Sequence, residues 1–341
     1  MALFHPQYKR EVRNSVDLNL SSLQSIFERY HDNSAFEVTD FKFDGDFGEG
    51  ANANANSDLK GLWVTLKKQS GEKEQVHVIV KTPFALGFFR AASRILEPFF
   101  RESLWYGVIV PELSRHFPEV AALVPGCYYS NCNRFDIQVP SKVQSLCCIL
   151  CWGPCKKSEE GIILLENMCL HPGQYRVLDK YTPMDVQHSL LTMRSLAHFH
   201  GAWFKILHGI DDGEDFANMF PFSSSDLRRA LKIRLPLIAL KPMINSVGKA
   251  VVKLLQKTEN EDLVSRVSRF YQDDAYPTFR DGYQFTHSRV ITVCHGDMWS
   301  NNLMFSYEPD STVPKSMKIL DYQLMFIGHP ARDIFFYAYI R

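Results

Sequence analysis

The stretch VCHGDMWSNNLMF, residues 293–305, sets polar groups at fixed intervals between apolar residues. His295 is followed two positions later by Asp297, and Asn302 comes five positions after Asp297. A carboxylate can accept the proton of a hydroxyl group, and carboxylate and amide oxygens are ligands that Mg²⁺ prefers. The order His, Asp, Asn at these spacings is that of a catalytic loop for phosphoryl transfer.

Phosphoryl transfer needs two further groups, a second carboxylate for the metal and a cation for the phosphates. Asp321 in KILDYQ follows an apolar run and precedes an aromatic residue, as that carboxylate would. Lys81 ends the strand-like run VIVK, where the cation is expected, and Glu102 on the next predicted helix is its natural ion-pair partner. A lone lysine is most often a surface residue. Four elements in this order indicate a site.

The elements that must position these residues can be predicted from apolar spacing. Periodicity predicts helices over 20–30, 93–117 and 186–204, and a helix-rich region over 227–272 that Pro236 and Pro242 interrupt. Alternating, β-branched and aromatic residues predict strands over 36–45, 59–68, 75–82, 162–165, 289–297 and 316–323. Residues 45–58, rich in Gly, Ala, Asn and Asp, predict a loop.

A β-rich half therefore precedes an α-rich half, which predicts an α+β fold with two lobes. We expect a β-rich nucleotide-binding lobe with an N-terminal helix over residues 1–167 and a helical catalytic lobe over 168–341. A Cys-rich segment at about 132–160 reads as an insertion in the first lobe.

Composition narrows the class of protein. The 341 residues include 38 Lys and Arg against 38 Asp and Glu, so no global charge favours nucleic acid or an acidic membrane as partner. The N-terminus has no apolar signal region, and the uncharged run Val143–Cys155 is shorter than a membrane-spanning helix. These features predict a soluble cytoplasmic protein with no membrane span.

The sequence also contains two alternative sets of metal ligands. Cys148 and Cys151 with Cys155 suggest a zinc site, but no fourth ligand has matching spacing, and reduced thiols are the favoured reading. A dinuclear metallophosphoesterase site is also conceivable, with the ligands His295, Asp297, Asp321 and His329. That site would need more ligands and gives Lys81 and Glu102 no role.

Several candidates also have a structural reading. Asp297 could cap a short helix instead of acting as a base. His295 is expected to brace the loop backbone and His200 to be a satisfied core histidine. Trp299 is expected to pack in the core, with a wall of the acceptor pocket as the alternative.

Two long motifs carry a resemblance to a known family. CHGDMWSNNLMF and LDYQLMFIGHPARDIFFY resemble the ecdysteroid-kinase-like, or CHK-kinase-like, family. This is a branch of the choline-kinase and aminoglycoside-phosphotransferase group, which has the protein-kinase-like fold. NANSDLKGLWV, FRESLWYGVIVPEL, ILLENM and LAHFHG resemble further family motifs. The resemblance extends over about Phe36 to Tyr339.

The resemblance implies ATP and Mg²⁺ as cofactors and assigns the site residues. Asp297 and Asn302 would be catalytic, and Asn302 and Asp321 would hold the metal. The implied nucleotide-binding residues are Asn54, Ser57, Lys81, Glu102, Glu166 and Met168. Asp333 would support the catalytic loop.

The implied function is ATP- and magnesium-dependent phosphorylation of a hydroxyl group on a small molecule, with a steroid, a choline-like compound or a xenobiotic as acceptor. The alternative is a catalytically inactive, pseudokinase-like nucleotide-binding or scaffold protein. Asn167 replaces the Asp of the family's hinge motif. The chain stops at Arg341 inside an apolar, helix-like run, so we expect it to be C-terminally incomplete.

Overall fold

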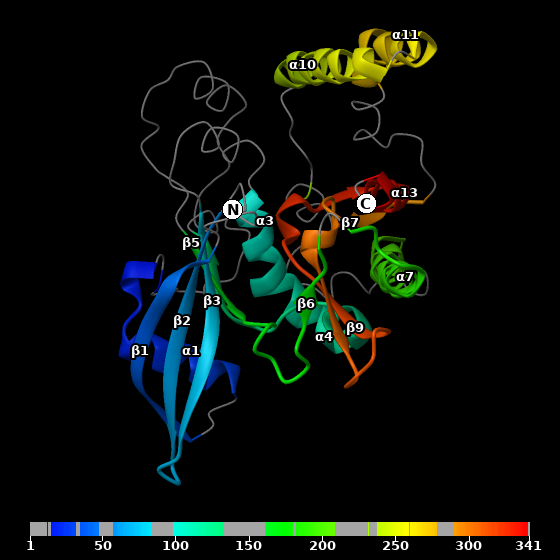
Figure 1. Ribbon diagram of the computed structural model, residues 1–341. Coiled ribbons are helices and arrows are strands. Elements are labelled where there is room, and N and C mark those ends of the chain that lie inside the picture. The colour runs from blue at the N-terminus through cyan, green and yellow to red at the C-terminus, as the bar shows by residue number, and fades with distance from the viewer. Residues whose placement is uncertain are drawn as a thin grey trace, which may run out of the picture.

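The computed structural model shows an α+β architecture, with an antiparallel sheet in the first half of the chain and a helix-rich second half (Figure 1). It describes residues 12, 15–31, 35–47, 57–83, 98–132, 161–179, 182–208, 231, 237–258, 260–277 and 290–339. Asn54 and the cysteines of the zinc alternative, Cys148, Cys151 and Cys155, lie outside these residues.

The first sheet has five antiparallel strands in the order β1-β2-β3-β5-β4. The strands are β1 Phe36–Phe47, β2 Ser57–Lys68, β3 Lys73–Pro83, β4 Cys127–Cys132 and β5 Gly161–Glu166. Parts of the predicted loop 45–58 belong to strands, because the pairing of β1 with β2 continues to Phe47 and Leu59. The strand β4 was not predicted from the sequence.

Alternation along the central strands separates the two faces of this sheet. Val78 and Val80 on β3 join the core beneath α1 (Leu20–Tyr30), together with Leu164 on β5. Lys81 follows Val80, so its side chain points to the opposite face. On β5, Leu165 likewise faces that second core.

A nearly continuous helical segment covers the second face. It consists of α3 Pro98–Leu104, a π-helical turn η2 Trp105–Ile109, α4 Val110–His116 and α5 Pro118–Ala121. In Figure 1, α3 lies between the five-stranded sheet and the elements of the C-terminal half. Glu102 on α3 therefore lies on the face of the sheet to which Lys81 points.

The second half contains the helices α7 Val186–His208, α10 Leu237–Leu255, α11 Glu261–Arg269 and α13 Ala331–Tyr339. Pro242 lies inside α10 and does not interrupt it, contrary to the prediction. It lies in the second turn of the helix, where its missing N–H removes one backbone hydrogen bond and the helix continues past it. No helix among the described residues is both long and apolar enough to cross a bilayer.

Two small sheets carry the predicted catalytic segments. One contains β6 Arg176–Val177, β8 Leu303–Tyr307 and β9 Pro314–Ile319, and the other pairs β7 Thr292–Cys294 with β10 Phe326–Gly328. The loop with Asp297 connects β7 to β8 through a 3-10 turn, η6 Ser300–Asn302. Asp321 stands between β9 and η7 Tyr322–Leu324.

The expected β-rich first half of the chain is present, and its last strand, β5, ends at Glu166. The division into lobes at residues 167 and 168 stays a prediction.

Candidate active site

Lys81 lies between two carboxylates from distant parts of the chain. Its Nζ atom is 2.6 Å from Glu102 Oε2 and 2.6 Å from Asp321 Oδ1. All three residues are buried, with exposed fractions of 3% for Lys81, 1% for Glu102 and 7% for Asp321. The predicted pairing of Lys81 with Glu102 is confirmed. The contact is a buried ion pair.

Burial and charge act against each other in this cluster. Burial would lower the pKa of Lys81, but Asp321 and Glu102 outweigh it and raise that pKa above its ordinary value. Burial raises the pKa of Glu102 to about 7, against the opposing effect of Lys81. One cation faces two carboxylates, so the ionised cluster has a deficit of positive charge. Such an arrangement favours uptake of a further cation.

Asp321 is also constrained by its neighbour and its backbone. Its Oδ2 atom accepts a hydrogen bond of 2.8 Å from Gln323 Nε2. Its φ of 65° lies in the left-handed region, which costs a non-glycine residue roughly 1 kcal/mol or more. Strain of this kind concentrates at functional sites. Gln323 was not predicted as part of the site, because residue spacing does not encode the left-handed backbone of Asp321.

Asp333 on α13 fixes the backbone of the catalytic loop. Its Oδ2 accepts the N–H of His295 at 2.8 Å, and its Oδ1 accepts the N–H of Gly296 at 2.8 Å. Gly296 has φ 88°, and a Cβ there would collide with the carbonyl oxygen of Leu324, so the turn requires glycine. These contacts are those expected of a residue that supports the loop.

His295 braces the same loop through both ring nitrogens. Nδ1 accepts the N–H of Asp297 at 3.2 Å, and Nε2 donates to the carbonyl of Leu320 at 2.9 Å. This pattern assigns a neutral ring, and burial lowers the pKa of His295 accordingly. With both nitrogens bound to backbone, His295 is not arranged as a metal ligand, which disfavours the metallophosphoesterase alternative.

Asn302 connects the catalytic loop to the segment that carries Asp321. Its Nδ2 donates to the carbonyl and to Oδ2 of Asp297, both at 2.9 Å, and its own carbonyl accepts the N–H of Leu320 at 2.8 Å. Burial and the charge of Asp321 raise the pKa of Asp297 to about 6. The carboxylate is therefore a stronger base than an ordinary aspartate.

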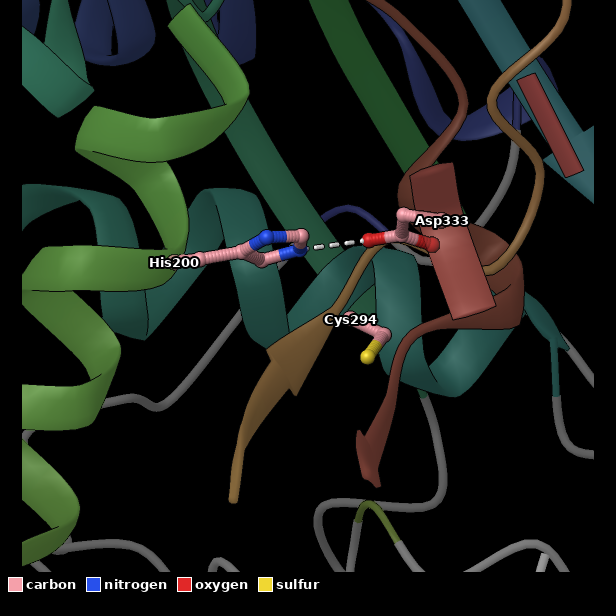
Figure 2. A group of neighbouring side chains, drawn as sticks. All are labelled: His200, Cys294 and Asp333. Carbon is pink, nitrogen blue, oxygen red and sulfur yellow. Dashed lines mark hydrogen bonds and ion pairs between the residues drawn. The ribbon is translucent and has the colours of Figure 1, made fainter. Parts of the chain in front are cut away.

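A second polar cluster lies next to the catalytic loop and consists of His200, Cys294 and Asp333 (Figure 2). Ligand atoms of His200, Cys294 and Asp333 lie within 4.8 Å of one another. Nε2 of His200 donates to Asp333 Oδ2 at 2.8 Å, and Cys294 Sγ donates to the carbonyl of His329 at 3.4 Å. Burial holds the pKa of the Cys294 thiol well above its usual range. Each group already has a partner, so the cluster supports α13 and the loop and does not form a metal site. His200 is a satisfied core histidine, as predicted.

The end of β5 presents the residues predicted to contact adenine. Met168 is buried, and Asn167 makes two contacts of its own. Asn167 Nδ2 donates to His77 Nδ1 at 2.9 Å, while its Oδ1 accepts the N–H of Cys169 at 3.0 Å. Asn167 therefore stabilises this turn through two hydrogen bonds. Ser57 begins β2 and pairs with Pro83, close to Lys81 on β3.

The sequence model of the ecdysteroid kinase-like family matches residues 53–341. The chain belongs to the ecdysteroid kinase-like family. The family expected from the motifs is therefore confirmed. The range that matches the ecdysteroid kinase-like family contains Lys81, Glu102, Asp297, Asn302 and Asp321, and it begins after β1.

Among solved structures, this ecdysteroid kinase-like chain is similar to the apoenzyme of macrolide 2'-phosphotransferase MphH from Brachybacterium faecium. The identity is 12%, the TM-score is 0.33, and the similarity covers 93% of this chain and 76% of that chain. No curated protein matches.

Proposed function

We propose that the protein transfers the γ-phosphoryl group of ATP to a hydroxyl group of a small molecule, with Mg²⁺ as cofactor. The convergence of Lys81, Glu102 and Asp321 carries the proposal. Burying charges usually costs as much free energy as their pairing returns, so this cluster is poorly explained by stability alone. Membership of the ecdysteroid kinase-like family supports the same class of reaction.

Lys81 is the proposed cation for the α- and β-phosphates, and Glu102 holds its ammonium group in place. The adenine base would contact the backbone of Glu166–Met168. Asn54 and Ser57, which precede β2 and begin it, would form the nucleotide loop.

The donor set fits Mg²⁺, which prefers oxygen ligands in proteins. Asn302 donates from Nδ2 to Asp297, which leaves its amide oxygen without a hydrogen bond among the described residues. Asp321 supplies a carboxylate beside it in the fold. Asn302 and Asp321 would hold the ion, which supplies positive charge at the phosphates when bound.

Asp297 is the proposed general base, which orients the acceptor hydroxyl and accepts its proton. Its pKa of about 6 makes it ionised at neutral pH and more basic than a solvated aspartate. Asn302 fixes the carboxylate through Oδ2, and His295 fixes the backbone N–H of the same residue. The base is thus held in place before the acceptor arrives.

The acceptor is proposed to be a small hydroxylated molecule, such as a steroid, a choline-like compound or a xenobiotic, and the site of action is proposed to be the cytoplasm. A pseudokinase-like protein would keep nucleotide binding without turnover. The joint presence of Lys81, Asp297, Asn302 and Asp321 favours catalysis over that alternative.

The test is ATP-dependent phosphorylation across a panel of hydroxylated metabolites, with Asp297→Asn as the matched inactive control. Transfer by the parent chain and its loss in the variant would support the proposal. Nucleotide binding without transfer to any acceptor in the panel would favour the pseudokinase alternative. A chain that binds no nucleotide would contradict both.

A further inference from the structure

A line of polar side chains crosses the five-stranded sheet and ends at the turn after β5. Asp44 Oδ2 on β1 accepts a hydrogen bond of 3.1 Å from Trp63 Nε1 on β2. The same carboxylate oxygen lies 3.6 Å from Nε2 of His77 on β3. On the other side of the ring, His77 Nδ1 is 2.9 Å from Asn167 Nδ2, and both residues are buried. The line therefore runs from an outer strand to the segment proposed to contact adenine.

The backbone decides which way the amide of Asn167 points. The N–H of Cys169 can only donate, and it lies 3.0 Å from Asn167 Oδ1. The amide nitrogen of Asn167 therefore faces His77, and it too can only donate. His77 Nδ1 is then the acceptor, so the ring is neutral and carries its proton on Nε2, toward Asp44. Burial lowers the pKa of His77, against the opposing charge of Asp44, and this favours the neutral ring.

The side chain of Asn167 folds over the turn that follows β5. Its bond to the N–H of Cys169 spans Met168, as in an Asx turn. The carbonyl of Met168 in turn accepts the N–H of Tyr175 at 3.2 Å. The side chain of Asn167 is thus one of the groups that orient the backbone of Met168, and His77 bonds directly to its amide nitrogen.

We propose that His77 is a positioning residue for the adenine end of the nucleotide site, acting through Asn167. Its neutral ring accepts from the amide nitrogen and so keeps Oδ1 of Asn167 on the N–H of Cys169. The backbone of Glu166–Met168 is thereby held in place before the base arrives. This inference rests on the proposed function, because it requires a nucleotide at that backbone. Lys81, further along β3, bonds to other partners, so we expect His77 to affect the base and not the phosphates.

The experiment compares two ligands that share the phosphate end. Binding of Mg·ADP and of Mg·tripolyphosphate is measured by calorimetry at a pH of about 8, where histidine is neutral. His77→Phe keeps a ring but removes the acceptor, and is expected to bind ADP about 5-fold more weakly, the effect of one lost hydrogen bond. His77→Asn places an amide oxygen close to the position of Nδ1 and is expected to bind ADP as the parent does. Both variants are expected to bind tripolyphosphate with the parental affinity.

A double variant tests whether His77 acts through Asn167. Asn167→Ala removes the bond to the N–H of Cys169 and is expected to weaken ADP binding by a similar factor. Adding His77→Phe to it is expected to cause no further loss, because effects within one hydrogen-bonded chain are not additive. His198→Asn is the matched control, since His198 is exposed on α7, and it is expected to bind both ligands as the parent does.

Four results would overturn the inference. Equal weakening of both ligands in His77→Phe would reduce His77 to a structural role. Parental ADP affinity in His77→Phe, or a loss of ADP affinity in His77→Asn, would show that the acceptor at Nδ1 is not needed. Additive losses in the double variant would show that His77 does not act through Asn167. A parent chain that binds neither ligand would instead overturn the proposed function, and this inference with it.

Discussion

Lys81 Nζ lies 2.6 Å from Asp321 Oδ1, so the cation proposed for the phosphates neutralises the carboxylate proposed for the metal. Glu102 holds Lys81 from the other side at 2.6 Å. If nucleotide binds as proposed, Lys81 is expected to exchange Asp321 for the phosphates while Glu102 remains its partner. The proposed binding is then an exchange of ionic partners within a buried cluster.

Mg·ATP is expected to raise the melting temperature of the protein, because a ligand that binds only the folded state stabilises it. Lys81→Ala and Asp321→Ala are expected to remove most of this shift, since each removes a charge that the exchange requires. The measurement is a thermal-shift titration with Mg·ATP. Lys67→Ala, on the exposed end of β2, serves as the matched lysine control. An unchanged shift in both site variants would show that nucleotide binds elsewhere.

Lys81→Met is expected to lower the free energy of unfolding by about 3 kcal/mol, because it leaves two buried carboxylates without their cation. Adding Glu102→Gln removes one of these charges and is expected to restore part of the loss. Urea unfolding of the parent, the single variants and the double variant measures the coupling. Strictly additive effects would mean that the two side chains do not interact in solution.

Asp297→Asn is expected to lower the phosphorylation rate by ~10²–10⁴-fold while leaving ATP affinity nearly intact. The amide keeps the shape and the hydrogen bond to Asn302 but cannot accept the proton. Asp321→Asn is expected to impair both rate and nucleotide affinity, because it alters the metal site. Turnover with an identified acceptor and calorimetric ATP binding separate the two effects. Parental turnover in Asp297→Asn would rule out the proposed base.

The same substitution is expected to stabilise the chain in the absence of nucleotide. The pKa of Asp297 is about 6 in the folded protein against an ordinary 3.8, so the folded state binds the proton more tightly. The stabilisation that comes from protonated Asp297 is complete below pH 3.8 and is lost as the pH rises through about 6. Asp297→Asn avoids this loss, so its free energy of unfolding is expected to exceed that of the parent chain by on the order of 2 kcal/mol at a pH of about 7.5.

Urea unfolding at several pH values tests this expectation. The advantage of Asp297→Asn is expected to shrink steadily as the pH falls toward the lower pKa. A difference that does not depend on pH would contradict the linkage.

Asp333→Asn is expected to lower the free energy of unfolding by about 2–3 kcal/mol. Both carboxylate oxygens accept backbone N–H groups, from His295 and Gly296, and an amide nitrogen would face one of these donors. Asp310→Asn is the matched control, since Asp310 is exposed at φ 61°, a conformation that asparagine tolerates. Chemical denaturation compares the two. Equal free energies of unfolding for Asp333→Asn and Asp310→Asn would show that the loop does not depend on the buried carboxylate.

The local part of the site could be predicted because its residues are neighbours in sequence. His295, Asp297 and Asn302 share one loop, and the apolar alternation before Lys81 predicted the strand that carries it. The order of the motifs then predicted the pairing of Lys81 with Glu102. These inferences needed only spacing and the polarity of the elements.

The remaining features depend on contacts between distant segments. The strand β4, CYYSNC, has no clear alternation, and its pairing with β5 across the chain defines it as a strand. The bond of Gln323 to Asp321 follows from the left-handed backbone of Asp321, which spacing does not encode. The bond from His200 to Asp333 joins residues 133 positions apart, and only the folded chain brings them together.

The hydrogen bonds from Gln24 of α1 to β1 also bear on the tendency of the protein to aggregate. An outer strand offers free backbone groups to which a strand of another molecule can add, and this is a common route to aggregation. Gln24 occupies two such groups, the N–H of Val38 and the carbonyl of Phe36 at 3.0 Å. The side-chain amide copies the donor and acceptor pair of a peptide unit, so α1 covers the first residues of this edge without adding a strand. A helix that lies outside the family match thus blocks one end of the edge strand against pairing with another molecule.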